Sequence, residues 1–422
     1  MNVRRLALDT LTDITDGGAY ANLRLKQAQA GLDEQQARFL GALVYSTLDH
    51  LLRIDHILAS FAPQRQKRAV RALLRLGACE LLFLHTPPHA AVSEYVSLCR
   101  AIGKGAVAGF LNAVLRRIDR ERDALPPLPA ALDERLSIQY SYPLWLVRKW
   151  LAERGERDTE ALLAQSPARL HVRPQYPMTA DALLPLLPAN THPGSLDPNC
   201  LYVPGGFDAA ASPLFLQGRM TVQGEGAMLA CRALGDCRGK HVLDACAAPG
   251  GKSAYLASLA GNDINLTCFE LHEHRSALIR STLSRLHVSA TVTTRDATIY
   301  DPAFDSAFDA VLLDAPCSGL GLLAGKPDLR YSKQEQDIAA LVEIQAALLD
   351  TCSRYVRPGG TLVYATCTIS LPENERQTDA FLSRSNEFTP IPLPFYPEAR
   401  LQLLPHVHGT EGFYLARMQR CI

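Results

Sequence analysis

The most constraining feature of this chain is a glycine-rich turn between an apolar strand and a helix, at residues 244–252. The string reads Asp-Ala-Cys-Ala-Ala-Pro-Gly-Gly-Lys. It follows a strand expected at residues 241–246 and opens a helix from about residue 252. Glycines let the backbone approach a ligand closely, and the free amides at a helix start face that ligand. The turn therefore predicts a ligand-binding loop on an α/β scaffold.

Strands and helices alternate from this turn to the end of the chain. We expect strands at residues 265–270, 290–294, 308–314, 361–366, 401–405 and 412–418, and helices at residues 272–287, 333–356 and 373–382. Short apolar strands separated by helices indicate a parallel sheet that is covered on both faces. In such sheets, ligands bind beyond the carboxyl ends of the strands.

The residues of the turn discriminate between classes of ligand. A P-loop would need glycine at the position of Cys246, so an ATPase is disfavoured, and the GxGxxG dinucleotide fingerprint is not matched. A third interpretation is the first loop of a Rossmann-like methyltransferase, which cradles the amino-acid end of S-adenosylmethionine. A purely structural turn is the alternative, but the string is more specific than a lone pair of glycines. Glu270 ends the next strand, where a carboxylate can bind both ribose hydroxyls. Asp296 follows the third strand and is placed to meet the adenine amino group. Either carboxylate could instead cap a helix or a loop.

Two cysteines follow strand ends beside this expected pocket. Asp314-Ala315-Pro316-Cys317 ends one strand, and Cys367 ends the next. If these strands are neighbours, both thiols project over the same edge of the sheet. A thiolate that adds to C6 of a pyrimidine makes C5 able to take a methyl group, so a thiol here points to methylation of carbon. Asp314 could stabilise the adduct through N3 and the exocyclic amine. The sequence alone does not choose which thiol attacks.

The front of the chain differs from this α/β part. Residues 1–125 are expected to be helical throughout and hold 17 Lys and Arg against 12 Asp and Glu, although the whole chain is balanced at 43 each. A basic stripe there is either a phosphate contact or a solvated helix face, and it comprises Arg65, Lys67, Arg68, Arg71 and Arg75. Prolines at 126–129 interrupt the helices. We therefore expect domains at residues 1–125, 126–220 and 221–422.

The assembled motifs resemble the RNA cytosine-C5 methyltransferase family over nearly the whole chain, most specifically at residues 244–252, 314–321 and 364–368. The front resembles the helical RNA-binding fold of NusB, at residues 36–40 and 112–116. Within this family, the chain resembles bacterial members that act on small-subunit (16S) ribosomal RNA. The resemblance implies three parts: an all-α NusB-like N-terminal domain, a small α+β linker domain and an α/β Rossmann-like methyltransferase domain.

The resemblance also implies roles for individual residues. Cys367 would be the nucleophile, and Cys317 would support proton removal and release of the product. Contacts to RNA would come from Lys326 and Arg330 and from the front-domain residues Arg65, Arg68, Arg71 and Arg75. Contacts to S-adenosylmethionine would come from Cys246, Ala247, Ala248, Pro249, Gly250, Gly251, Lys252, Glu270, Asp296 and Asp314.

We therefore expect an enzyme that transfers a methyl group from S-adenosylmethionine to C5 of an unpaired or flipped cytosine in 16S ribosomal RNA. The absence of a long apolar run predicts no membrane span, and eleven cysteines without a CxxC pair fit a reducing cytoplasm. We expect a monomer and no metal. A non-catalytic RNA-binding factor and a C5 methyltransferase of another RNA, such as tRNA, remain as alternatives.

Overall fold

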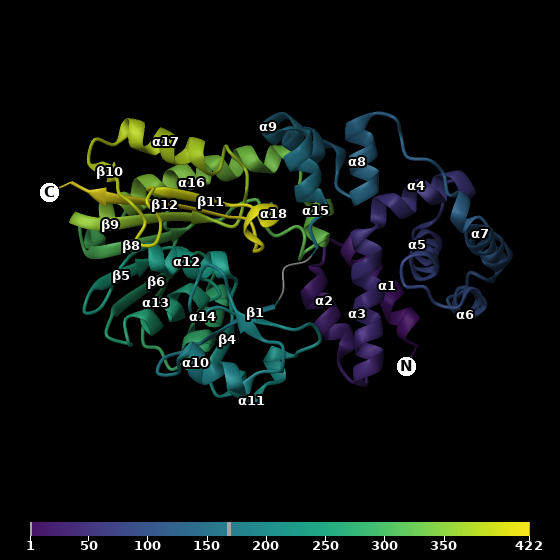
Figure 1. Ribbon diagram of the computed structural model, residues 1–422, viewed down its shortest axis with the longest axis horizontal. Coiled ribbons are helices and arrows are strands. Elements are labelled where there is room, and N and C mark those ends of the chain that lie inside the picture. The colour runs from purple at the N-terminus through teal and green to yellow at the C-terminus, as the bar shows by residue number, and fades with distance from the viewer. Residues whose placement is uncertain (1, 167–169, 422) are drawn as a thin grey trace. The chain divides into compact units, whose positions relative to one another are not determined.

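A computed structural model of the chain describes residues 2–166 and 170–421. The described residues form two compact units (Figure 1). The first holds the residues up to 166 together with Leu323–Lys333, and the second holds the other described residues. A segment that lies in the sequence between two strands of the second unit is therefore part of the first.

The first unit is helical, as expected. It packs leucine-rich helix faces into one core, in which Leu11, Leu43, Leu73 and Leu111 are fully buried. Residues 38–61 lie in two helices that meet at His50. The helix at Leu144–Leu163 is broken at Gly155, whose φ of 78° only glycine adopts readily. The elements are α1 (Val3–Thr15), α2 (Ala21–Gln29), α3 (Glu34–Asp49), α4 (Leu51–Phe61), α5 (Arg68–Leu82), α6 (Pro88–Ala101), η1 (Gly105–Val107), α7 (Ala108–Arg120), η2 (Arg122–Ala124), α8 (Leu132–Tyr140), α9 (Leu144–Leu163) and α15 (Asp328–Ser332).

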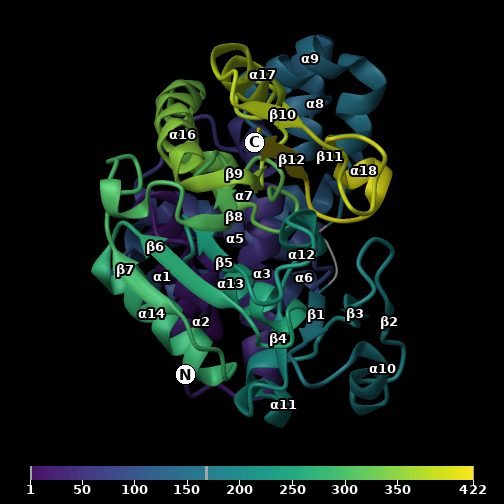
Figure 2. The same ribbon diagram turned by 90° about the vertical axis from the view of Figure 1, so that its left-hand side faces the viewer.

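The second unit begins with a small antiparallel sheet in the strand order β2-β3-β1-β4 (Figure 2). Its own core contains Val172, Leu201 and Met220, so the expected small α+β region is present. Its elements are β1 (Leu170–Pro174), α10 (Ala180–Leu183), η3 (Leu184–Leu186), β2 (His192–Pro193), β3 (Leu201–Val203), η4 (Ala209–Ala211), α11 (Pro213–Leu216) and β4 (Met220–Val222).

The larger sheet of this unit follows the order β10-β12-β9-β8-β5-β6-β7, with β11 paired to β12. The strands from β9 to β7 are parallel to their neighbours, as expected. The elements are α12 (Glu225–Ala233), β5 (His241–Asp244), α13 (Gly251–Leu259), β6 (Asn265–Glu270), α14 (Glu273–Arg285), β7 (Thr291–Thr294), η5 (Pro302–Phe304), β8 (Phe308–Asp314), α16 (Glu335–Tyr355), β9 (Val356–Thr366), α17 (Glu375–Arg384), β10 (Phe388–Pro390), β11 (Arg400–Leu403), α18 (Pro405–His408) and β12 (Phe413–Arg420).

Helices cover both faces of this sheet. Along β8, Ala310 and Leu312 join the core under α12, α13 and α14, whereas Val311 and Leu313 join the core under α16 and α17. Figure 1 shows α16 and α17 on one side of the strands and α13 and α14 on the other. The alternation explains why the strands read as continuous apolar runs, because both of their faces are buried.

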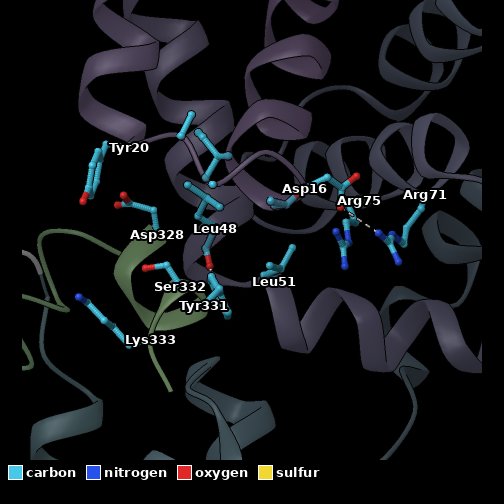
Figure 3. Close-up of a pocket in the computed structure, with 14 residues that line it drawn as sticks. Asp16, Tyr20, Leu48, Leu51, Arg71, Arg75, Asp328, Tyr331, Ser332 and Lys333 are labelled. Atoms are coloured by element: carbon cyan, nitrogen blue, oxygen red, sulfur yellow. Dashed lines mark hydrogen bonds and ion pairs between the residues drawn. The ribbon is translucent and has the colours of Figure 1, made fainter. Parts of the chain in front are cut away.

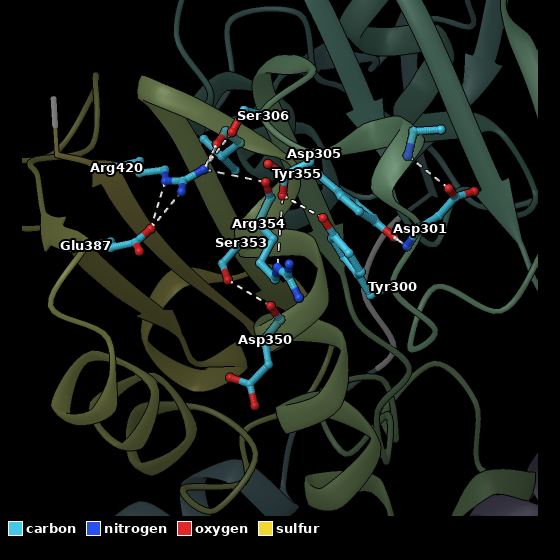
Figure 4. A network of polar contacts seen from close by, with 12 residues as sticks. Tyr300, Asp301, Asp305, Ser306, Asp350, Ser353, Arg354, Tyr355, Glu387 and Arg420 are labelled. Carbon is cyan, nitrogen blue, oxygen red and sulfur yellow. Dashed lines mark hydrogen bonds and ion pairs between the residues drawn. The ribbon is translucent and has the colours of Figure 1, made fainter.

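One edge of the sheet is antiparallel, which the strand pattern did not predict. Strand β12 pairs antiparallel with β9, and β10 and β11 pair with β12. Arg420 at the end of β12 fastens this edge, since its guanidinium donates to the carbonyl oxygen of Val356 at 2.6 Å and to the carboxylate of Glu387 at 3.0 Å (Figure 4).

Candidate active site

The glycine-rich turn joins β5 to α13 at the carboxyl edge of the parallel strands. Gly250 has a φ of 99°, and a Cβ there would lie 3.3 Å from the backbone of Ile279, so only glycine fits this close approach. Behind the turn, the Ser253 hydroxyl donates to Asp244 at 2.6 Å. Burial raises the pKa of Asp244 to about 6. Its second carboxyl oxygen has no hydrogen-bond partner among the described residues, which leaves an acceptor beneath the loop.

The other predicted acidic residues end neighbouring strands. Because the strand order is β7-β6-β5-β8, Asp296, Glu270, the turn and Asp314 follow one another along a single edge. Glu270 is only 4% exposed and accepts from the backbone amide of His272 at 3.1 Å. Asp296 accepts from the amide and hydroxyl of Thr298 at 2.9 and 2.6 Å. Each carboxylate thus also caps its own loop, the alternative that the sequence had left open.

Lys252 and Asp314 form an ion pair between the turn and the end of β8, with 2.6 Å between Nζ and Oδ2. Burial lowers the pKa of Lys252, but the charge and hydrogen bond of Asp314 outweigh burial, so the pKa stands above its ordinary value. A fixed cation therefore lies beside the carboxylate that was predicted to face the cytosine.

The two strand-end cysteines meet. Strands β8 and β9 are parallel neighbours, with Asp314 opposite Ala365, and the Sγ atoms of Cys317 and Cys367 lie 3.3 Å apart. Both residues are half-buried. The pKa of the Cys317 thiol lies well above its ordinary value. The larger cause is the hydrogen bond with Cys367, and the second is burial. The geometry thus holds one protonated thiol against the other, next to Asp314.

Two buried residues that no motif flagged support this site. Glu373, fully buried, accepts hydrogen bonds from Ser318, the residue after Cys317. Arg173 of β1, also fully buried, donates to the backbone carbonyl of Gly251 at 3.2 Å. Motif spacing could not identify either residue, because each one bonds a partner that lies at least 55 residues away in the sequence.

The basic stripe of the helical unit divides into exposed and buried members. Arg65, Arg68 and Lys67 are exposed, and the side chain of Arg71 is 42% exposed with its guanidinium 3.2 Å from Asp16. Arg75 differs, since its side chain is only 10% exposed and both of its donors bind Asp55, at 2.8 and 2.6 Å. These contacts favour a structural role for Arg75 over the predicted RNA contact.

Arg330, for which an RNA contact was predicted, is buried. It lies in α15, is 5% exposed, pairs with Asp49 at 3.1 Å and stacks over the Tyr142 ring at 4.2 Å. Lys326, four residues earlier, is exposed. Of the two residues predicted to contact RNA in this stretch, Lys326 is the one that solvent reaches.

The same helical unit has a pocket of about 360 Å³, and α15 forms one side of it (Figure 3). Tyr20, Asp328 and Lys333 lie toward one end, and Asp16 and Arg71 toward the other. Charges of both signs line the pocket, so it presents no single-sign phosphate site.

Within residues 2–166 and 170–421, no group of His, Cys, Asp and Glu is arranged to hold a metal ion. In the same residues, no helix combines the length and apolar character that a bilayer crossing requires.

Comparisons with known proteins find relatives over nearly the whole length of the chain. The family model described as "16S rRNA methyltransferase RsmB/F" matches residues 232–419, and the NusB family model matches residues 1–120. "Probable ribosomal RNA small subunit methyltransferase B" from Bacillus subtilis is 36% identical over 449 residues, covering 99% of each chain. "Ribosomal RNA small subunit methyltransferase B" from Shewanella oneidensis is 32% identical over 436 residues, again 99% of each.

Among solved structures, the crystal structure of PH0851 shares the fold, with 24% identity, a TM-score of 0.85 and coverage of 100% of this chain and 99% of that one. The NusB match confirms the resemblance predicted for the helical front. Full-length relatives at this identity are sufficient to assign a family. The chain therefore belongs to the RsmB/F family of 16S rRNA methyltransferases, S-adenosylmethionine-dependent enzymes that methylate cytosine at C5.

Proposed function

We propose that this chain methylates C5 of one cytosine in 16S ribosomal RNA through a covalent bond between Cys367 and C6, and that Cys317 helps to resolve the adduct. The observation that carries the proposal is the 3.3 Å contact between the two Sγ atoms at the ends of adjacent strands. Two half-buried thiols beside a carboxylate are suited to covalent pyrimidine chemistry, in which one difficult substitution becomes two easier steps.

The residues at the strand edge fit the cofactor. The amides of the turn from Cys246 to Lys252 would hold the amino-acid end of S-adenosylmethionine, Glu270 the ribose hydroxyls and Asp296 the adenine amine. The unpartnered oxygen of buried Asp244 and the close backbone at Gly250 support such a site. When bound, the cofactor supplies an electrophilic methyl group on a sulfonium.

The chain's own groups divide the chemistry between them. The Cys367 thiolate would bond to C6, and the electron pair of the C5–C6 double bond would move to C5. C5 would take the methyl group as the bond between the methyl carbon and the sulfonium sulfur breaks, with its electron pair staying on sulfur. A base removes the C5 proton, and its electron pair restores the double bond as the Cys367–C6 bond breaks. Asp314 would accept a hydrogen bond from the exocyclic amine, and Lys252 keeps that carboxylate in place.

The pKa of Cys317 supports its role as the proton-handling partner. A thiol whose pKa is raised by its neighbour stays protonated at neutral pH, and a protonated thiol is not the reactive form of a nucleophile, because the thiolate attacks. Cys317 can therefore hand a proton to the departing sulfur of Cys367.

Alanine variants of the two cysteines test these roles. Cys367→Ala should abolish methylation and form no adduct, whereas Cys317→Ala should leave RNA covalently attached, seen as a shifted band on a denaturing gel. An active Cys367→Ala variant together with an adduct-free Cys317→Ala variant would refute the assignment. Calorimetry with S-adenosylmethionine excludes the non-catalytic alternative if the cofactor binds.

Bisulfite sequencing of ribosomal RNA and tRNA from cells that lack the protein identifies the RNA and the cytosine. Loss of a methyl mark from tRNA alone would favour the tRNA alternative. The expected monomer and cytoplasmic location stay predictions, which sedimentation analysis and cell fractionation check. For RNA contact we propose the exposed residues Arg65, Arg68, Arg71 and Lys326.

A further inference from the structure

A buried carboxylate joins the two cysteine loops. Glu373 lies between β9 and α17 and is fully buried. Its Oε1 accepts from the backbone amide of Ser318 at 2.8 Å, and its Oε2 accepts from the Ser318 hydroxyl at 2.6 Å. Ser318 directly follows Cys317, so both carboxylate oxygens of Glu373 are bonded to the loop that carries this thiol.

The same carboxylate reaches the loop of the second thiol. The hydroxyl of Thr368, the residue after Cys367, lies 3.4 Å from Glu373 Oε2 and 2.8 Å from the Ser318 hydroxyl. The amide nitrogen of Gln345, on α16, donates both to Glu373 at 3.2 Å and to the carbonyl oxygen of Pro316 at 2.9 Å. Residues on both sides of Cys317 and the residue after Cys367 are thus held by one network.

All four side chains of this network are nearly inaccessible, with exposed fractions of 0% for Glu373, Thr368 and Gln345 and 2% for Ser318. Removing a carboxylate from water is expensive, and among the residues that the structure describes this cost is offset by hydrogen-bond donors, with no ion pair to Glu373. An ionised carboxylate only accepts hydrogen bonds. It therefore suits a position where an amide, a hydroxyl and a side-chain amide all donate to the same group.

We propose that Glu373 is a positioning residue that holds the Cys317 and Cys367 thiols at their working separation by bonding the residue after each of them. The inference rests on the proposed function of the two thiols, since it explains how their contact is maintained. Glu373 does not contact the reacting atoms. It fixes the backbone from which both sulfur atoms project, and small displacements of such groups cost large factors in rate.

Thiol proximity tests the proposal without any reaction on RNA. Dibromobimane bridges two thiols that lie close together, and mass spectrometry of the digested protein identifies the Cys317–Cys367 bridge among the other cysteines. We expect Glu373→Gln, which presents a donor amide to existing donors, to lower the yield of this bridge about tenfold. Glu343→Gln, the same chemical change on an exposed site of α16, should leave the yield at the wild-type level.

Catalysis gives the second readout. Glu373→Gln should lower kcat about 10- to 100-fold with the KM for S-adenosylmethionine unchanged, because the network does not reach the glycine-rich turn. Thr368→Val removes one hydroxyl at nearly constant volume and should act in the same direction. Thr368→Ser keeps the hydroxyl and should retain most of the wild-type rate that Thr368→Val loses. This pair keeps the test available if the Glu373 variant fails to fold.

The outcomes are separable. A wild-type bridge yield in Glu373→Gln, or in Thr368→Val if the former does not fold, overturns the positioning role while the cysteine assignment stands. A lowered yield with unchanged kcat also overturns it. If Cys367→Ala still methylates RNA, the proposed function fails, whatever the bridge yield of the Glu373 variant. A lowered yield, a lowered kcat and rescue by Thr368→Ser together support the proposal.

Discussion

Replacing the buried Arg173 should remove a hydrogen bond that holds the glycine-rich turn in place. Its guanidinium is fully buried and donates to the side chains of Gln223 and Gln175 at 2.6 and 2.7 Å. It also donates to the carbonyls of Pro174 and Gly251, at 2.9 and 3.2 Å, and lies over an aromatic ring. Burial lowers the pKa of Arg173 to about 10, so the group remains charged at neutral pH.

The size of the effect follows from the bonds lost. Arg173→Met keeps much of the side-chain volume but leaves buried acceptors without a donor, each worth about 1–3 kcal/mol of unfolding free energy. Of the hydrogen bonds that Arg173 donates, the one to the Gly251 carbonyl reaches the turn. A hydrogen bond from a charged donor contributes about 1.5 kcal/mol or more, and each 1.4 kcal/mol is about tenfold in affinity. We therefore expect the Kd for S-adenosylmethionine to rise about tenfold.

Isothermal titration calorimetry of the folded variant measures this change. The matched control is Arg285→Met, because Arg285 bonds the carbonyl of Phe215 and the hydroxyl of Thr221 in the small sheet region without touching the turn. The control should lose stability but keep its affinity for the cofactor. Equal affinity in the Arg173 variant and the wild type, or equal weakening in both variants, would refute the link through Gly251.

Three further predictions concern pH, the helical unit and RNA. Burial raises the pKa of Asp244 from 3.8 to about 6, so the carboxyl stabilises the fold when protonated and this contribution is lost as the pH rises through 6; Asp244→Asn should flatten the resulting decline in unfolding free energy between pH 4 and 7 in urea titrations. Arg330→Ala removes the cation that pairs with the half-buried Asp49 and should destabilise the helical unit by about 1–3 kcal/mol in thermal or urea unfolding, whereas an unchanged unfolding free energy would refute a structural role. Charge reversal at Arg68 and Arg71 should weaken RNA binding in filter assays at low salt and matter less at high salt, and unchanged affinity would make the stripe a solvated face.

The sequence predicted that the two cysteines share one edge of the sheet because strand ends are local features. Cys317 and Cys367 each follow an apolar run directly, and parallel neighbours bring their carboxyl ends to one edge. The only nonlocal assumption was that the two strands are adjacent, which the structure confirms. The positions of Glu270, Asp296 and Asp314 followed from the same reasoning.

The sequence could not predict which partner each charged residue finds. Helical spacing placed Arg75 on the same stripe as Arg71, but it could not show that Asp55 of another helix pairs with Arg75. Arg330 pairs with Asp49, which lies 281 residues away in the sequence. The importance of Glu373 likewise depends on its hydrogen bond with Ser318, a residue that only the fold brings beside it. The antiparallel edge was missed because the strand pattern records periodicity but not direction.

The proposed reaction requires that a sulfur atom of this chain bonds to the pyrimidine ring during methyl transfer. The most direct measurement is mass spectrometry of the Cys317→Ala variant after incubation with 16S RNA and S-adenosylmethionine, followed by nuclease and protease digestion. We expect a methylated cytidine nucleotide attached to the peptide that carries Cys367. A methylated RNA product released at the wild-type rate with that peptide unmodified, or an adduct on a different residue, would contradict it.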